Sequence, residues 1–184
     1  MKQDIDLIKR CKRNDTQAQS ELFEKYKDTL YFLSLKYCKN EADAKDNTHD
    51  AFITIFESIK NYKGKGSFEG WMKRITIYKA IAKYKAKKPI YIDYKNDLLE
   101  DTSIEENKMN LPIDYLLKCI QELPDQYRLV FNLYQLDNFS HKEVAKMLSI
   151  SESTSKSNFY RAKQLLKKAI LNSDKPFKNS NNGA

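Results

Sequence analysis

Apolar residues recur every three or four positions along much of the chain, which is the spacing of one face of an α-helix. The pattern runs through residues 15–38 and again through residues 41–60. Residues 67–88 continue it, and at 3.6 residues per turn their apolar positions fall within an arc of about 120°. That third set is Phe68, Trp71, Met72, Ile75, Tyr78 and Ala82. We therefore expect a helix over each of these three ranges, the third with these residues as its core stripe.

Glycine and proline are scarce, with four of each, and lie mostly at the borders of these runs. Long stretches can therefore be helical without a residue that breaks the helix. The turn residues and flanking alternation of a β-hairpin are not found. The predicted fold class is all-α.

A second helical region follows residue 111 and has the signals of a helix-turn-helix. Pro124 can open a helix at its first position. Ser140 precedes Glu143 by three positions, the capping-box spacing that begins a short helix. Ser151 is placed to cap the next helix, which should continue to about Leu171. Helices joined by so tight a turn cross steeply and leave the second one projecting.

Charge divides the chain into parts, within an overall net charge of +8. Residues 1–90 are net +8, with 20 basic and 12 acidic side chains, whereas residues 91–110 are net −4, with 2 and 6. We expect two small helical domains, 1–90 and 111–172, joined by an acidic linker at 91–110 that serves at least as a solvated spacer. Residues 173–184, rich in Asn, Lys and Ser, are expected to be disordered.

Two neighbouring helices of the first domain carry opposite charge. Residues 41–58 are net −4 and residues 60–88 are net +9. The basic segment attracts nucleic acid and the acidic one repels it, so the acidic helix should face a protein or only water. Asp43, Asp46 and Asp50 share one face of that helix, but no second set of carboxylates or histidines completes a metal site. We predict no bound metal.

The basic segment begins with a glycine-containing loop, residues 61–66, and continues with aromatic and cationic side chains. This combination suits single-stranded DNA, whose bases stack on rings while amines follow the phosphates. Phe68 and Trp71 are assigned to the core instead, because they fall on the apolar arc.

The last helix begins with short polar and cationic side chains of the kind that contact base edges and phosphates. Lys156 is expected to contact a phosphate, and Asn158 to read a base, because Asn can pair with an adenine edge. An ordinary amphipathic helix with a solvated basic face is the alternative. His141, beside the cap, is expected at the surface and not as a ligand.

Composition excludes several other classes of protein. Cys11, Cys38 and Cys119 lie too far apart in sequence for a zinc knuckle and are interpreted as small core residues. No uncharged stretch approaches the roughly 18 apolar residues of a membrane helix, and the charged N-terminus is unlike a signal peptide. We expect a cytoplasmic protein that binds no cofactor and does not insert in a membrane.

Four motifs, in order, resemble one family. They are residues 43–52 (DAKDNTHDAF), residues 66–75 (GSFEGWMKRI), Leu123-Pro124, and Thr154-Ser155-Lys156-Ser157. Together with the short length, they resemble the bacterial RNA polymerase sigma factors of the sigma-seventy family, in the extracytoplasmic-function (ECF) group. The resemblance covers about residues 15–172.

The resemblance implies a factor, not an enzyme, that binds core RNA polymerase, recognises promoter DNA and melts it to initiate transcription. The implied polymerase-binding residues are Asp43, Asp46, His49 and Asp50. The implied contacts to the −10 element are Asn61, Lys63, Lys65, Ser67, Lys73, Arg74, Tyr78 and Lys83. The implied contacts to the −35 element are Ser153, Thr154, Lys156, Ser157, Asn158 and Arg161. The acidic linker would run towards the RNA exit path, and an anti-sigma protein is a candidate partner because such proteins commonly hold members of the family inactive.

The sequence departs from the family pattern in three places. The departures are Asn47, Thr48 and His49, for two apolar residues and Gln; Tyr78 and Ala82, for Asn and for Asp or Asn; and Ser155, for an apolar residue of the recognition helix.

Two other functions stay open at this point. A helix-turn-helix regulator with an N-terminal ligand or dimerisation domain would explain residues 111–172 equally well, without binding polymerase. An enzyme acting on nucleic acid through Asp43, Asp46 and Asp50 would need a metal.

Overall fold

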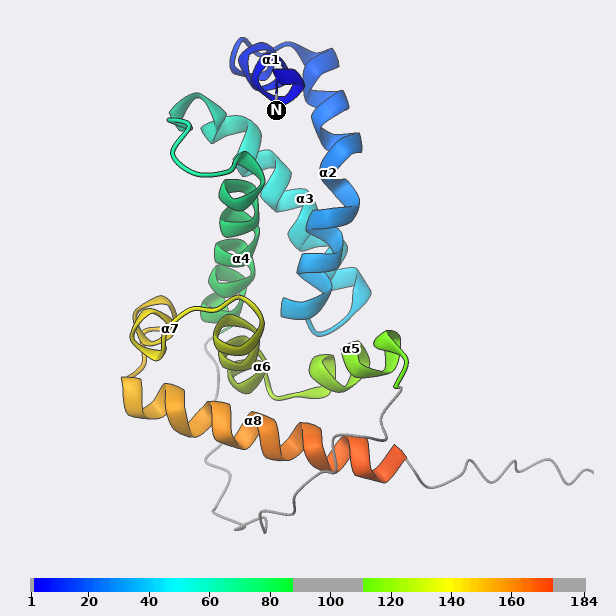
Figure 1. Cartoon of the computed structure of the whole chain (residues 1–184), viewed down its shortest axis with the longest axis vertical. Helices are drawn as coiled ribbons and strands as arrows, with labels where there is room; N and C mark the ends of the chain where they lie inside the picture. Colours follow the sequence, from blue (N-terminus) through cyan, green and yellow to red (C-terminus); the bar gives the residue numbers. More distant parts are fainter. Residues whose placement is uncertain (1, 88–110, 174–184) are drawn as a thin grey trace, which may run out of the picture. The chain divides into compact units, whose positions relative to one another are not determined.

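The computed structural model describes residues 2–87 and 111–173, and every regular element within these ranges is a helix, as predicted (Figure 1). The helices form two compact units, the first built from α1 to α4 and the second mainly from α5 to α8. The predicted acidic linker and residues 174–184 of the predicted disordered tail lie outside the described residues. None of the described helices is both long and apolar enough to cross a membrane.

The N-terminal unit contains α1 (Lys2–Lys12), α2 (Thr16–Tyr37), α3 (Glu41–Ser58), a 3-10 turn η1 (Ile59–Asn61) and α4 (Phe68–Ala86). The side chains of Asp15, Asn40 and Ser67 accept backbone N–H groups in the first turns of α2, α3 and α4, which fixes where each helix begins. Helices α2, α3 and α4 pack against one another, and α1 packs on α2. Their shared core is Leu7, Cys11, Ala18, Leu22, Leu30, Phe52, Ile55, Ile59, Phe68 and Met72.

The buried face of α4 differs from the predicted stripe. Tyr78 is 49% exposed and Ala82 is also exposed, so the prediction that they line the core is wrong. The buried positions instead advance in steps of four residues, through Met72, Thr76 and Ala80. Each such step turns about 40° beyond a full circle, so the buried stripe winds around the helix and away from Tyr78. Thr76 was not expected in the stripe because threonine is polar. It can be buried because its hydroxyl donates to the Met72 carbonyl of the same helix at 3.0 Å.

A polar cluster lies inside this unit, at positions where the sequence departs from the pattern of the family that it resembles. Asn47 is 0% exposed, and its Nδ2 donates to Ser34 Oγ at 3.0 Å and to the Thr76 carbonyl at 3.2 Å. Thr48, also buried, donates to the Ala44 carbonyl at 2.8 Å. These side chains therefore join α2, α3 and α4 by hydrogen bonds at positions where apolar packing was the expectation.

The C-terminal unit contains α5 (Ile113–Glu122), α6 (Asp125–Phe131), a π-helical continuation η3 (Asn132–Leu136), α7 (His141–Leu148) and α8 (Glu152–Ser173). Helices α5 and α6 pack along α8. One core cluster of this unit is Cys119, Leu123, Tyr127, Ala162 and Leu166. All three cysteines of the chain are buried, as predicted.

The helix starts of this unit follow the predicted caps. The Ser140 N–H donates to Glu143 Oε2 at 2.8 Å, and the Glu143 N–H donates back to Ser140 Oγ at 3.3 Å, which is the reciprocal capping box. The Thr154 N–H donates to Ser151 Oγ at 3.0 Å. The tight turn between α7 and α8 passes through Ser149, whose φ is +59°.

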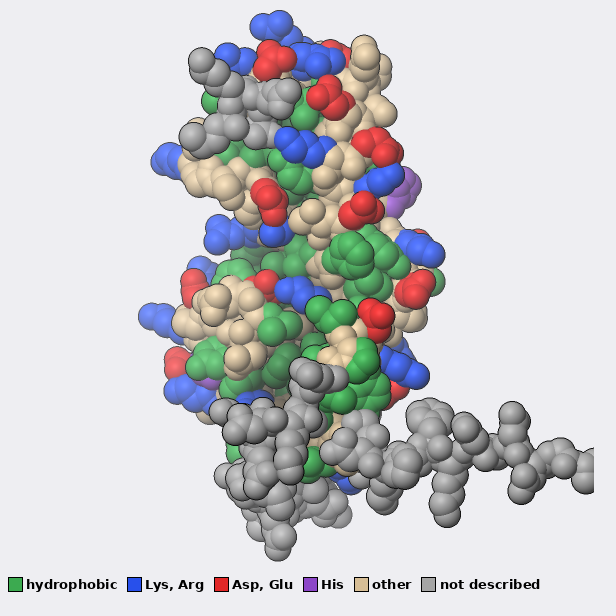
Figure 2. All heavy atoms as spheres, turned by 45° about the vertical axis from the view of Figure 1, so that its right-hand side comes forward, with side chains coloured by type: hydrophobic (Ala, Val, Ile, Leu, Met, Phe, Trp, Pro, Cys, Tyr) green, Lys and Arg blue, Asp and Glu red, His purple; other side chains and the backbone are tan. Residues whose placement is uncertain are grey.

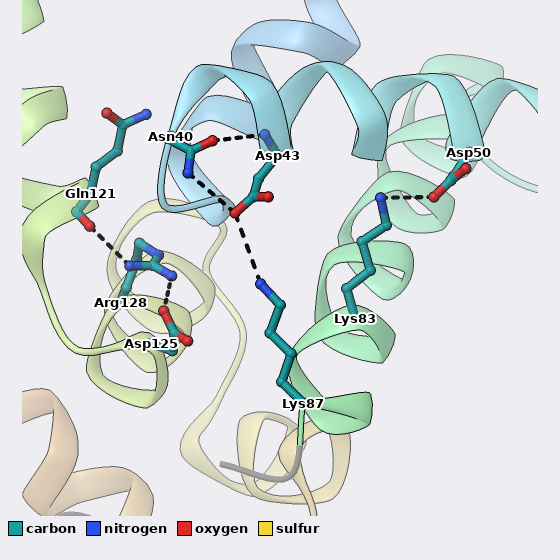
Figure 3. A network of polar contacts seen from close by, with 8 residues as sticks. All are labelled: Asn40, Asp43, Asp50, Lys83, Lys87, Gln121, Asp125 and Arg128. Atoms are coloured by element: carbon teal, nitrogen blue, oxygen red, sulfur yellow. Dashed lines mark hydrogen bonds and ion pairs between the residues drawn. The ribbon is translucent and has the colours of Figure 1, made fainter. Parts of the chain in front are cut away.

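A buried arginine ties α5 to α6. Arg128 is 4% exposed, and its Nη1 donates to the Gln121 carbonyl at 3.0 Å (Figure 3). The same Nη1 also donates to the Leu123 carbonyl at 2.8 Å. Its Nη2 pairs with Asp125 at the start of α6. The guanidinium thus donates to two carbonyls at the C-terminal end of α5, and the Asp125 carboxylate supplies the opposite charge.

Candidate protein and DNA interfaces

The outer face of α3 is acidic and also carries an apolar side chain. Asp46 and His49 are exposed, and Asp43 and Asp50 are partly exposed. Ile53, in register with Asp46 and Asp50 on the helix, is 46% exposed. Apolar side chains do reach the surface among charged ones in this protein, as the green groups between red and blue ones in Figure 2 show. Counting charges missed Ile53, although its spacing of seven from Asp46 could have revealed it.

Two of the acidic residues on α3 pair with lysines, one in the last turns of α4 and one at its C-cap. Asp50 lies 2.7 Å from Lys83 Nζ and Asp43 lies 3.9 Å from Lys87 Nζ (Figure 3). Lys83 was expected among the −10 contacts and Asp50 among the polymerase contacts, yet the two side chains meet across the helix pair. Both are more than a third exposed, so this pair stabilises the fold by no more than about 1 kcal/mol.

The loop at residues 61–67, which begins at the last residue of η1 and ends before α4, presents its polar side chains to solvent. Asn61, Lys63, Lys65 and Ser67 are all exposed. Ser67 also serves as the N-cap of α4, accepting the Gly70 N–H at 3.0 Å, so its hydroxyl already has a structural partner. The loop therefore offers two lysines and an asparagine at its surface.

The outward side of α4 combines a cation with an aromatic ring. Arg74 is exposed, and Tyr78, one turn further, lies on the same side. Lys73 is only partly exposed and pairs with Glu69 at 2.6 Å. Phe68 and Trp71 stack at 5.5 Å between ring centroids and pack with the core, as predicted.

The exposed side of α8 has Ser153, Lys156 and Ser157 near its start. Thr154 is partly buried, and its hydroxyl lies 2.7 Å from Ser151 Oγ. Lys156 pairs with Glu152 at 2.9 Å but keeps 61% of its side chain exposed. Tyr160, one turn after Lys156, is 55% exposed and was not among the predicted −35 contacts.

Two residues expected to contact the −35 element lie elsewhere. Asn158 is 4% exposed, because it shares the inward face of α8 with Ser155 and Ala162. The prediction that Asn158 reads a base does not fit this position. Arg161 is partly buried, and its Nη1 donates to the Tyr127 hydroxyl at 3.3 Å, which gives it a role in packing α8 on α6.

A histidine explains why serine is accepted inside the helix-turn-helix. Ser155 is 0% exposed, and its Oγ lies 2.9 Å from His141 Nδ1. The His141 ring stacks on Tyr134 at 3.9 Å between centroids. Burial lowers the pKa of His141, and the nearby Lys156 ammonium acts in the same direction. His141 is thus half-buried rather than a simple surface residue, and it joins the first helix of the motif to the second.

Comparison with known proteins identifies the family. Residues 22–89 match the family model described as Sigma-70 region 2, and residues 113–166 match the one described as Sigma-70, region 4. The chain is 27% identical over 176 residues to the ECF RNA polymerase sigma factor SigW of Bacillus subtilis, covering 89% of this chain and 94% of that one. This chain belongs to the ECF group of the sigma-70 family.

A second curated relative and one solved structure are also similar to this chain. The RNA polymerase sigma-H factor of Pseudomonas aeruginosa is 24% identical over 181 residues, covering 91% of this chain and 94% of that one. Among solved structures, the sigma factor RpoE of Bartonella quintana, in complex with the anti-sigma factor NepR, has a TM-score of 0.53 at 16% identity. That match covers 84% of this chain and 97% of RpoE, and it supports the all-α fold.

Proposed function

We propose that this ECF sigma factor binds core RNA polymerase through α3, captures the melted −10 element with residues 61–83, and reads the −35 element with α8. Membership of the family implies promoter-specific initiation of transcription together with RNA polymerase. The observation that carries the finer assignment is the separation of surfaces. One helix pair of the N-terminal unit has an acidic outer face on α3 and a basic loop and helix beside it.

The polymerase contact is assigned to Asp43, Asp46, His49 and Asp50, with Ile53 added. DNA is repelled by the carboxylates, so this face suits a protein. An exposed isoleucine among charges suits the mixed polar and apolar surface of a protein interface.

The −10 contact is assigned to the loop and to the outward side of α4. Extruding a base from a duplex costs a few kcal/mol. Lys63, Lys65 and Arg74 can offset that cost through phosphates, and the half-exposed ring of Tyr78 offers a stacking surface. Asn61, Ser67, Lys73 and Lys83 complete the proposed set. For Lys73 and Lys83, DNA would have to compete with the carboxylates of Glu69 and Asp50.

The −35 contact is assigned to the exposed side of α8, as duplex recognition in a major groove. It comprises Ser153, Thr154, Lys156 and Ser157, with Tyr160 added and Arg161 kept as a partly exposed cation. Asn158 is omitted because it is buried. We also propose that the factor acts in the cytoplasm and that an anti-sigma protein is among its partners, since the similar sigma factor RpoE is found in complex with the anti-sigma factor NepR.

Reconstitution tests this function. The full chain mixed with bacterial core polymerase should start transcription at a defined set of sites on genomic DNA, and sequencing the RNA ends should reveal shared elements upstream. Core polymerase alone is the control. Tight binding to duplex DNA by the chain alone, without specific starts when polymerase is added, would favour the helix-turn-helix regulator instead.

A further inference from the structure

The first helix reaches the base of the loop at residues 61–67. Leu7 and Cys11 of α1 are buried in the core of the N-terminal unit, which fixes the helix in place. In the last turn of α1, Lys12 Nζ donates a hydrogen bond to the Tyr62 carbonyl oxygen at 2.7 Å. The same ammonium lies 5.9 Å from the centroid of the Tyr62 ring, within cation–π range. One side chain from outside the loop thus holds both the backbone and the ring of Tyr62.

Tyr62 in turn spans the loop. Its hydroxyl donates to the Gly66 carbonyl at 2.9 Å. Its ring packs against Phe68 and Trp71, at 5.1 Å and 5.4 Å between centroids. The two ends of the loop are therefore joined through a single side chain that is anchored on the core.

Between these contacts the loop has little else to restrain it. Gly64 and Gly66 have φ of +74° and +77°, the left-handed region that favours glycine, and a Cβ at either position would meet no atom within 4 Å. Fixing such a segment costs roughly 1–2 kcal/mol of backbone entropy per residue. Because the bonds from Lys12 to Tyr62 and from Tyr62 to Gly66 already order the loop, this entropy is lost when the protein folds and not when it binds DNA.

We propose that Lys12 and Tyr62 are positioning residues, which hold the loop in one conformation for capture of the unpaired −10 strand. They act through the loop, because Lys12 is directed at a backbone carbonyl and the Tyr62 ring packs on the core. The inference rests on the proposed role of the loop, and it adds α1 to the promoter-reading apparatus. A loop that is already ordered binds more tightly than one ordered at the moment of binding.

The variants Lys12→Met and Tyr62→Phe separate positioning from general stability. Lys12→Met removes the ammonium and keeps most of the stem, and Tyr62→Phe removes only the hydroxyl. Lys9→Met is the matched control for charge, since Lys9 is an exposed residue of the same helix. Tyr31→Phe is the matched control for loss of a hydroxyl. Lys12→Arg should restore function, because a guanidinium can donate to the same carbonyl.

Fluorescence reports on the loop in the free full-length chain. Trp71 is the one tryptophan of the sequence and touches the Tyr62 ring. Its quenching constant with acrylamide should rise about twofold in Lys12→Met and Tyr62→Phe, because the ring above it loosens. The melting midpoint by circular dichroism should move by less than about 4 °C. Lys9→Met, Tyr31→Phe and Lys12→Arg should match the original protein.

Binding of a single-stranded −10 oligonucleotide by the holoenzyme gives the functional readout. Its sequence is taken from the promoters that the original holoenzyme selects. Lys12→Met and Tyr62→Phe should each weaken this binding about three- to tenfold, the factor expected for one lost hydrogen bond. Affinity for core polymerase should be unchanged.

The outcomes distinguish this inference from the proposed function. If the original holoenzyme selects no promoters, the proposed function is wrong and the inference falls with it. If it selects promoters and binds the oligonucleotide, but Lys12→Met equals Lys9→Met in both assays, only the inference is overturned. A change in quenching without a change in oligonucleotide binding would also overturn it, because the order of the loop would then have no influence on DNA binding.

Discussion

At the scale of single residues, polar side chains occupy core positions where the family pattern has apolar ones. Burying a polar group without a partner costs about 1–3 kcal/mol in proteins. Asn47 Nδ2 donates to Ser34 and to the Thr76 carbonyl, and Ser155 meets His141, which offsets part of that cost. The sequence reveals the unusual letters but not their partners, because Ser34, Asn47 and Thr76 lie on three different helices.

His141 makes the stability of the C-terminal unit depend on pH. Burial lowers the pKa of His141 below its ordinary value of 6.5, with Lys156 adding to the effect and Glu152 opposing it. As the pH falls, the unfolded chain therefore takes up the proton before the folded one does. The contribution of neutral His141 to stability is fully present above about pH 6.5 and declines as the pH falls below that value. We expect the melting midpoint to fall between pH 7.5 and pH 5.5 by more in the original protein than in His141→Gln.

The exposed histidine of α3 provides the control for this measurement. His49→Gln replaces the exposed histidine of α3, which touches neither Ser155 nor Tyr134 among the described contacts, and serves as the control for loss of an imidazole elsewhere in the chain. Equal pH dependence in His141→Gln and the original protein would contradict the prediction.

At the scale of elements, capping residues and apolar spacing predicted α2, α3, α4, α7 and α8. Ser140, Ser151 and Ser67 act within a few residues of themselves, so their effect can be read from a short window. The faces of the helices were harder to predict. Tyr78 and Asn158 were predicted on the wrong faces because α4 and α8 each pack against two other helices. Which face of such a helix is buried depends on residues far along the chain.

The acidic face of α3 leads to a prediction about polymerase binding. Ile53→Ser and Asp46→Lys should each weaken binding to core polymerase about tenfold, by removing apolar contact area and by reversing a charge, respectively. Both side chains are exposed, so the melting midpoint should stay within a few degrees. Affinity measured at moderate salt gives the readout.

Phe32 supplies the control for this face. It lies on α2, is 64% exposed, and Phe32→Ser removes a comparable apolar surface from another helix. Polymerase affinity that drops equally for Phe32→Ser and Ile53→Ser would show that α3 is not the specific contact.

The two faces of α8 should separate DNA contact from packing. Lys156→Ala removes one phosphate contact and should lower the slope of log affinity against log salt by about 0.9, for all sequences alike. Tyr160→Ala should weaken binding at the preferred −35 element. Asn158→Ala should change neither the salt slope nor the sequence preference, because its side chain is buried. Holoenzyme titrations on duplex promoters decide this, and a loss of −35 preference in Asn158→Ala would return that residue to the base-reading set.

At the scale of the whole molecule, two units with separate cores predict two independent unfolding reactions. The helix caps of the C-terminal unit, its core around Leu123 and Leu166, and the Arg128 contacts all lie within residues 111–173. A chain of residues 111–184 alone should therefore give a helical circular dichroism spectrum and a cooperative melt. A random-coil spectrum would contradict the prediction that this domain is self-contained.

The full-length chain offers a sharper test of independence, because its only tryptophan lies in the N-terminal unit. Trp71 fluorescence follows that unit, whereas circular dichroism at 222 nm follows the helices of both. Lowering the pH from 7.5 to 5.5 should therefore shift the part of the circular dichroism melt that belongs to the C-terminal unit, through His141, by more than it shifts the Trp71 transition. In His141→Gln this extra shift should disappear, and the fluorescence transition should stay where it was. If Trp71 followed the His141 titration as closely as the dichroism does, the two units would unfold as one cooperative body and the division into independent units would be wrong.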